Sequence, residues 1–92
     1  MTEPAALLGL PVRADGVRLG TVGAVWVDAA DRVLGMEIRG KGNETGHYLP
    51  YQAARLENDI VEASPLAILG VIEPVGFLRR RGARRVTQAD DG

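Results

Sequence analysis

The densest group of chemically capable side chains is a run of arginines near the end of the chain. Five guanidinium groups fall within seven positions, and they belong to Arg79, Arg80, Arg81, Arg84 and Arg85. Guanidinium groups pair with phosphates or carboxylates through two parallel hydrogen bonds. Each cation near an anionic membrane contributes about 1 kcal/mol, and the preceding Phe77 and Leu78 add a small apolar contribution. The run therefore suits a nucleic-acid backbone, an anionic membrane or an acidic protein surface.

The formal net charge of −1 conceals a division between two parts of the chain. Residues 1–76 hold 6 Lys/Arg against 10 Asp/Glu, a net charge of −4, whereas residues 77–92 hold 5 Arg against 2 Asp, a net charge of +3. The nucleic-acid backbone that attracts the arginines would repel an acidic body. The arginines can also stay solvated in a disordered tail, or pair with the acidic body of the same or a neighbouring copy. The sequence leaves all these alternatives open.

The few aromatic side chains form a second set of candidates. Trp26 is the only tryptophan, Tyr48 and Tyr51 are the only tyrosines, and Phe77 is the only phenylalanine. Large aromatic side chains fill or seal a small barrel, and they are also favoured at protein interfaces. We count these four residues with the five arginines as candidate interaction residues, and a core position is favoured for Trp26.

Residues suited to catalysis are scarce. The chain has no Cys, and its one Ser and one His are Ser64 and His47. Ser64 precedes a proline and lies in no nucleophile elbow, and one imidazole cannot make a multi-histidine metal site. The glycine-rich residues 40–46 precede a short strand, not the helix that a phosphate-binding loop needs. We expect no enzyme activity, no cofactor, no metal site and no small-molecule substrate.

Short strands separated by turns are the elements that must position these residues. Period-two alternation and turn residues predict six strands, at residues 8–13, 18–27, 33–39, 47–50, 60–64 and 66–72. Asp15-Gly16 is a hairpin signal between the first two strands, and residues 51–55 suit one helical turn. We expect no long helix. The pattern is typical of an all-β barrel or sandwich.

The strand at residues 18–27 is largely apolar on both faces, so we expect part of it to be covered on both sides. Val25 lies on one face, and Val22 and Trp26 lie on the other. Gly20 and Gly23 interrupt the strand, which predicts a bulge or the sharp bend of a small barrel. The strand at residues 33–39 alternates cleanly, with Leu34, Met36 and Ile38 inward and Val33, Gly35, Glu37 and Arg39 outward.

Several of these segments resemble the PRC-barrel pattern. They are Leu8-Gly9-Leu10-Pro11-Val12, Asp15-Gly16, Leu19-Gly20-Thr21-Val22, Val25-Trp26-Val27-Asp28, Val33-Leu34-Gly35-Met36 and Tyr48-Leu49-Pro50-Tyr51. That family takes its name from the cytoplasmic domain of the photosynthetic reaction centre H subunit, and it includes the C-terminal domain of a ribosomal small-subunit maturation factor. The resemblance covers residues 7–70 and implies a compact β-barrel that binds other proteins, without family-wide catalytic residues.

The resemblance and the charge division predict a PRC-barrel-like domain of about six short strands at residues 1–76. They also predict a basic tail at residues 77–92, for which disorder is one of the expected states. We expect a non-enzymatic protein-interaction or scaffold module that forms a homodimer, because so short a chain with few aromatic residues offers a limited core. The alternative is an RNA- or ribosome-associated factor, or an adaptor on an anionic membrane, that uses the arginines. The acidic N-terminus and the lack of a long apolar run predict a cytoplasmic location.

Overall fold

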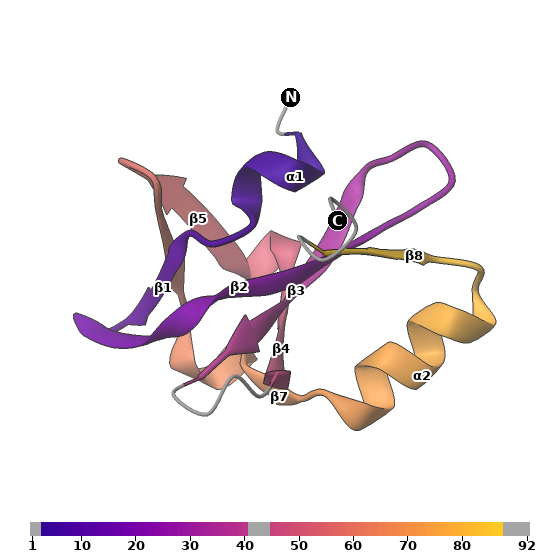
Figure 1. The fold of residues 1–92 in the computed structure, drawn as a ribbon. Coiled ribbons are helices and arrows are strands. Elements are labelled where there is room, and N and C mark those ends of the chain that lie inside the picture. The colour runs from indigo at the N-terminus through magenta and orange to yellow at the C-terminus, as the bar shows by residue number, and fades with distance from the viewer. Residues whose placement is uncertain (1–2, 41–44, 88–92) are drawn as a thin grey trace.

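One curled β-sheet with two short helices makes up the fold, seen in a computed structural model that describes residues 3–40 and 45–87 (Figure 1). The strands are β1 (Pro11–Ala14), β2 (Val17–Val27), β3 (Val33–Arg39), β4 (Thr45–Pro50), β5 (Ala54–Glu57), β6 (Ile60–Ala63), β7 (Leu69–Gly70) and β8 (Arg84–Val86). The helices are α1 (Pro4–Leu7) and α2 (Ile72–Arg80), with single 3₁₀ turns η1 (Tyr51–Ala53) and η2 (Pro65–Ala67). The all-β class and the barrel-like architecture are confirmed, with eight strands in the described residues where we expected six.

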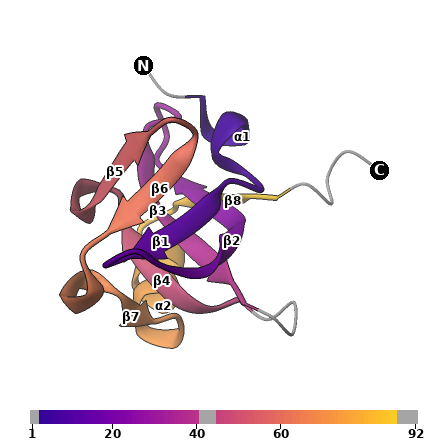
Figure 2. The ribbon, with the colours of Figure 1, turned by 90° about the vertical axis from the view of Figure 1, so that its left-hand side faces the viewer.

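The long strand β2 is the centre of the sheet. The strand order is β5-β6-β1-β2-β3-β4-β7, and β8 pairs with β2 off this path. All neighbours are antiparallel except β1 and β6, which run parallel. The first half of β2 pairs with β1 and its last three residues pair with β8, while β3 lies along its other side. Figure 2 shows how this arrangement curls the strands around a common interior.

Two tight hairpins shape the curl. Asp15 and Gly16 connect β1 to β2 with φ values of 51° and 77°, and Asn58 and Asp59 connect β5 to β6 with φ values of 51° and 61°. Positive φ at both central residues is the mark of a type I′ turn, whose twist matches that of paired strands. The hairpin predicted at Asp15-Gly16 is therefore confirmed.

A bulge at Gly23 decides which side chains of β2 face the interior. The pairing with β3 shifts between Val22 and Ala24, so Gly23 is an extra residue on β2. One extra residue inverts the alternation that precedes it. Val22 consequently joins Val25 in the interior, and our placement of Val22 on the side of Trp26 is wrong. The predicted irregularity of this strand is confirmed.

A second shift inverts the start of β3. The register changes where Trp26 pairs with Gly35 and Val27 pairs with Val33, which leaves Leu34 as an extra residue. Leu34 therefore packs on the outer side of the sheet and Val33 packs against the interior, the reverse of the prediction. Met36 and Ile38 lie in the interior as predicted.

The sheet has an apolar cluster on each face. The inner cluster fills the curl and contains Leu7, Val12, Val22, Val25, Val27, Met36, Ile38, Leu49, Val61 and Ala63. The outer cluster consists of Trp26, Tyr48 and Leu78, with Leu34, Val71, Val75 and Ala83 packed around it. The second half of β2 is thus covered on both faces, as predicted for part of the strand, while Val17 and Leu19 at its start are exposed. The outer cover is helix α2 (Figure 1).

Other elements differ from the predicted boundaries. The first strand begins at Pro11 and not at residue 8, because a turn at residues 8–9 follows α1. The predicted helical turn is η1, and the unpredicted strand β5 follows it. Residues 66–72, predicted as one strand, contain part of η2, the two-residue β7 and the start of α2. The expected domain boundary at residue 76 falls inside α2, residues 77–80 form the rest of that helix, and residues 84–86 form β8.

Candidate interaction surface

Helix α2 lies on the sheet through three apolar positions. Val71, Val75 and Leu78 are spaced four and three residues apart, which places them on one side of a helix. They pack against Trp26 and Tyr48, whose exposed fractions are 1% and 5%. The structure therefore buries both aromatic side chains beneath α2. Tyr51 is half-buried and packs against the inner cluster instead.

A buried carboxylate lies beside this cluster. Glu37 is only 3% exposed, and Oε2 accepts a hydrogen bond from Trp26 Nε1 at 2.7 Å. The guanidinium of Arg85, on β8, donates to the same carboxylate from Nε to Oε2 at 2.7 Å and from Nη2 to Oε1 at 3.0 Å. The alternation of residues 33–39 predicted that Glu37 lies on the outer face of the sheet, and this is confirmed, but the side chain is buried there and not exposed to solvent. Its partner is 48 positions away, so no local pattern could have identified the pair.

Tyr48 on β4 pairs with Glu37, and its ring lies against the backbone of β3 at Gly35. Burial raises the pKa of the Tyr48 hydroxyl above its ordinary value of 10.0, and the negative charge of Glu37 raises it further. A side chain at Gly35 would collide with the Tyr48 ring. The close approach of the Tyr48 ring therefore requires a glycine at position 35, although glycine is usually unfavourable in the middle of a strand.

Most of the arginine run is engaged within the chain. Arg84 forms an ion pair with Asp31, and Arg85 holds Glu37. Arg79 lies over the ring of Trp26, with Cζ 5.4 Å from the ring centroid, and Arg81 lies over Phe77 at 5.0 Å. Such contacts attract a cation to the electron-rich ring face. Arg80 is exposed and forms no ion pair with another described residue.

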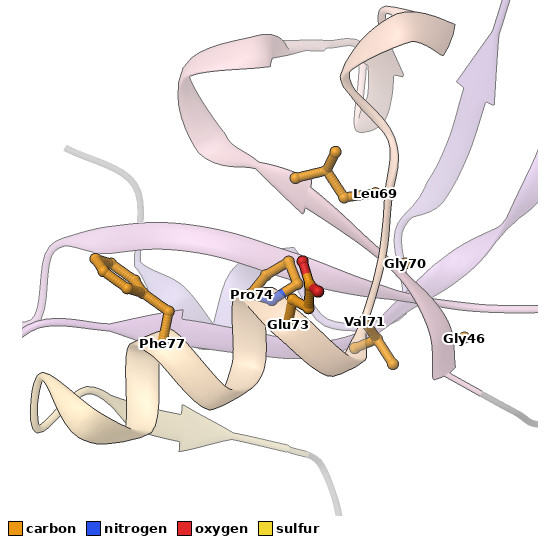
Figure 3. Close-up of a pocket in the computed structure, with 7 residues that line it drawn as sticks. All are labelled: Gly46, Leu69, Gly70, Val71, Glu73, Pro74 and Phe77. Carbon is orange, nitrogen blue, oxygen red and sulfur yellow. The ribbon is translucent and has the colours of Figure 1, made fainter.

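An open apolar groove runs between β7 and α2. Its volume is about 890 Å³, and its lining residues are Gly46, Leu69, Gly70, Val71, Glu73, Pro74 and Phe77. Leu69 and Phe77 stand on the same side of α2, with Glu73 and Pro74 between them (Figure 3). The side chains of Leu69 and Phe77 remain 44% and 50% exposed. Exposed apolar side chains from two elements therefore line one depression.

The residues weighed for catalysis do not come together. His47 lies in β4 opposite Gly70 of β7 and is exposed, and Ser64 is exposed before η2. In residues 3–40 and 45–87, no three His, Asp or Glu side chains gather in a way that could hold a metal ion. Residues 41–44, which contain most of the glycine-rich loop, lie outside the described residues. No helix in the described part of the chain is long and apolar enough to cross a membrane.

A single curled sheet with an open surface groove defines a small β-barrel-type domain. The PRC-barrel domain family matches residues 4–69 of the chain. Because that is more than half of its length, the chain belongs to the PRC-barrel domain family, a fold of protein-interaction and scaffold type. A search of curated proteins finds no match to the chain. Since the family match ends at Leu69, helix α2, strand β8 and most of the groove lie outside it.

Proposed function

We propose that this chain is a non-enzymatic protein-interaction module that self-associates through the groove between β7 and α2. The main support for this proposal is the pair of half-exposed apolar side chains, Leu69 and Phe77, that line the groove. Apolar depressions with aromatic anchors are where protein partners gain most of their binding energy. The family supports the coarser part of the proposal, because its fold serves protein interaction.

The expected strength of this association is modest. Complete burial of a Leu or Phe side chain is worth about 1.5 to 3 kcal/mol, and about half of that is already gained when the side chain is half-buried. Leu69 and Phe77 would each contribute about 1 kcal/mol more on association, on both copies. A gain of this size must offset lost rotational and translational freedom, so dimers should depend on concentration.

Binding to RNA, to the ribosome or to an anionic membrane through the arginines has less support. Arg84 and Arg85 are already paired with Asp31 and Glu37, so a phosphate would have to displace a carboxylate. Arg79 and Arg81 lie over aromatic rings but keep exposed guanidinium groups. This alternative is an outcome of the test below, and a cytoplasmic location likewise stays a prediction.

Sedimentation velocity of the full chain over a concentration series tests self-association. The informative variant is Leu69→Glu, which places a charge in the groove, and the matched control is Leu66→Glu. Leu66 is 95% exposed and lies three positions earlier, outside the groove. We expect concentration-dependent dimers for the wild type and for Leu66→Glu, and monomers for Leu69→Glu. A wild-type monomer throughout the series, or equal effects of the two substitutions, would refute the proposal.

A parallel titration addresses the alternative. Single-stranded RNA and vesicles with anionic lipids are each mixed with the wild type at low and high salt. Affinity that falls steeply with salt and is lost in the variant Arg79→Glu/Arg80→Glu would favour the arginine surface, because phosphate contacts release counterions. We expect no such binding.

A further inference from the structure

The exposed side of α2 carries an ordered stripe of three residues. Glu73 and Phe77 of α2, and Arg81, which caps its C-terminal end, follow one another at intervals of four positions, so they lie along one side of the helix. All three are exposed, and the Arg81 guanidinium lies over the Phe77 ring. The inner side of the same helix is occupied by the outer cluster of the sheet. The stripe is thus free to meet another molecule while α2 stays docked.

Two opposite charges flank Phe77 at equal distances along the stripe. An acid stands four positions before Phe77 and a base stands four positions after it. When two copies of α2 run antiparallel around a twofold axis at Phe77, Glu73 of each copy faces Arg81 of the other. When the helices run parallel, like charges face each other at both ends. Opposed helix dipoles favour the antiparallel arrangement as well.

We propose that the groove is occupied by α2 of a second copy, in antiparallel orientation, with the two Phe77 side chains at the twofold axis. The inference rests on the proposed function and names the partner of the same groove. Leu69 and Pro74 line the groove beside Phe77, where the Phe77 ring of the second copy would enter (Figure 3). The contact is isologous, because the same patch serves on both copies.

Charge complementarity selects a second copy over an unrelated partner. The stripe supplies both an acid and a base at matched distances from its aromatic centre, so it is complementary to itself. The Arg81 guanidinium forms no ion pair with another described residue and lies over the Phe77 ring of the same stripe, so pairing with a second copy breaks no ion pair. The stripe lies beyond residues 4–69, the part of the chain that the family match covers, so the family fold by itself does not supply it.

Cysteine cross-linking tests the orientation directly, because the chain has no Cys of its own. One preparation carries Glu73→Cys and the other carries Arg81→Cys. In an antiparallel dimer that contains one copy of each variant, the cysteine at position 73 of one copy faces the cysteine at position 81 of the other. The opposite Arg81 and Glu73 of that mixed pair are still intact, and Phe77 is unchanged. We expect a disulfide-linked dimer in the mixture and little in either preparation alone under mild oxidation.

The matched control mixes Glu73→Cys with Leu66→Cys, which places the second thiol at an exposed site away from the stripe. Cross-linking of this control to the same extent would show random collision and overturn the arrangement. Cross-linking of Glu73→Cys with itself would show a parallel pair and overturn it too. If no mixture cross-links while Leu69→Glu still abolishes sedimenting dimers, the helix arrangement fails and the proposed function stands. If the wild type never dimerises, both fail.

Charge reversal is a second readout that keeps every apolar contact. We expect Glu73→Arg and Arg81→Glu each to weaken dimerisation by about fivefold, because two exposed charge pairs become repulsive. The double variant Glu73→Arg/Arg81→Glu restores the pairing with its polarity exchanged. Wild-type affinity in both single variants, or a double variant as weak as the single ones, would contradict the antiparallel register.

Discussion

Arg85 on β8 holds Glu37 on β3 through two hydrogen bonds, of 2.7 Å and 3.0 Å, across the strand β2 that separates them. Trp26 on β2 donates a third hydrogen bond to the same carboxylate. The three residues therefore tie three strands together at one buried point. This bond network also fastens the segment that carries α2, and with it the groove, to the family fold.

Glu37→Ala should lower the free energy of unfolding by about 2 to 3 kcal/mol. The substitution leaves the buried Trp26 Nε1 without its acceptor, and such a loss costs about 1 to 3 kcal/mol. The loss of the Arg85 ion pair costs less than the loss of a fully buried one, because 35% of the Arg85 side chain is exposed and its guanidinium can be hydrated instead. Chemical denaturation measures the change. The control Arg84→Ala breaks an exposed pair and should cost less than about 1 kcal/mol. Equal losses in the two variants would contradict a special role for Glu37.

Gly35→Ala should destabilise the fold by about 1 to 3 kcal/mol, because its methyl group would collide with the Tyr48 ring. Gly40→Ala is the matched control, since nothing lies within 4 Å of a Cβ at that position. Thermal or chemical denaturation of both variants gives the comparison. A double-mutant cycle with Tyr48→Ala should show strong coupling, as the ring is the obstacle. Additive effects would indicate another cause.

The stability of the wild type should fall at alkaline pH in part because of Tyr48. Burial and the charge of Glu37 raise the pKa of Tyr48 in the folded state above 10.0. A pKa raised by folding contributes stability below the unfolded value, and this contribution is lost as the pH rises from that value through the folded one. The wild type should therefore lose stability relative to Tyr48→Phe as the pH rises above about 10. A difference that is constant across this range would contradict the shift.

Removal of the end of α2 together with β8 should uncover the single tryptophan. A chain that ends at Gly76 lacks Leu78, Arg79 and Arg85, which contact Trp26 or the carboxylate that it binds. The fluorescence emission of Trp26 should shift to longer wavelength because its indole meets water. A chain that ends at Thr87 keeps α2 and β8 and should retain the wild-type emission. Identical spectra from the two folded chains would show that α2 does not cover Trp26.

The part of the fold that follows from local patterns was predictable. Asp15-Gly16 marks a hairpin because two consecutive positive φ angles suit few residue pairs, and the alternation of β2 and β3 indicates strands. The irregularity of β2 was also predictable from its glycines. The direction of individual side chains was not, because the bulge at Gly23 and the extra Leu34 each invert a stretch of the pattern.

Helix α2 escaped prediction because its apolar signal is short and interrupted. Val71, Val75 and Leu78 have helical spacing, but Pro74 and Gly76 stand between them, and both residues are weak helix formers. Proline is tolerated in the first turn, where its missing N–H has no intrahelical partner. The helix is stabilised by packing on Trp26 and Tyr48, which belong to distant strands.

The sequence by itself determined most of the strands, the hairpin at Asp15-Gly16, the family and the separation of an acidic body from a run of arginines. Only the tertiary structure decided what those arginines do, since Arg84 and Arg85 find Asp31 and Glu37 through the pairing of β8 with β2. It also decided that Trp26 is covered and that Phe77 is exposed. The physical reason is that alternation and turn chemistry act between neighbours in the chain, whereas ion pairs and the packing of layers act between residues that folding alone brings together.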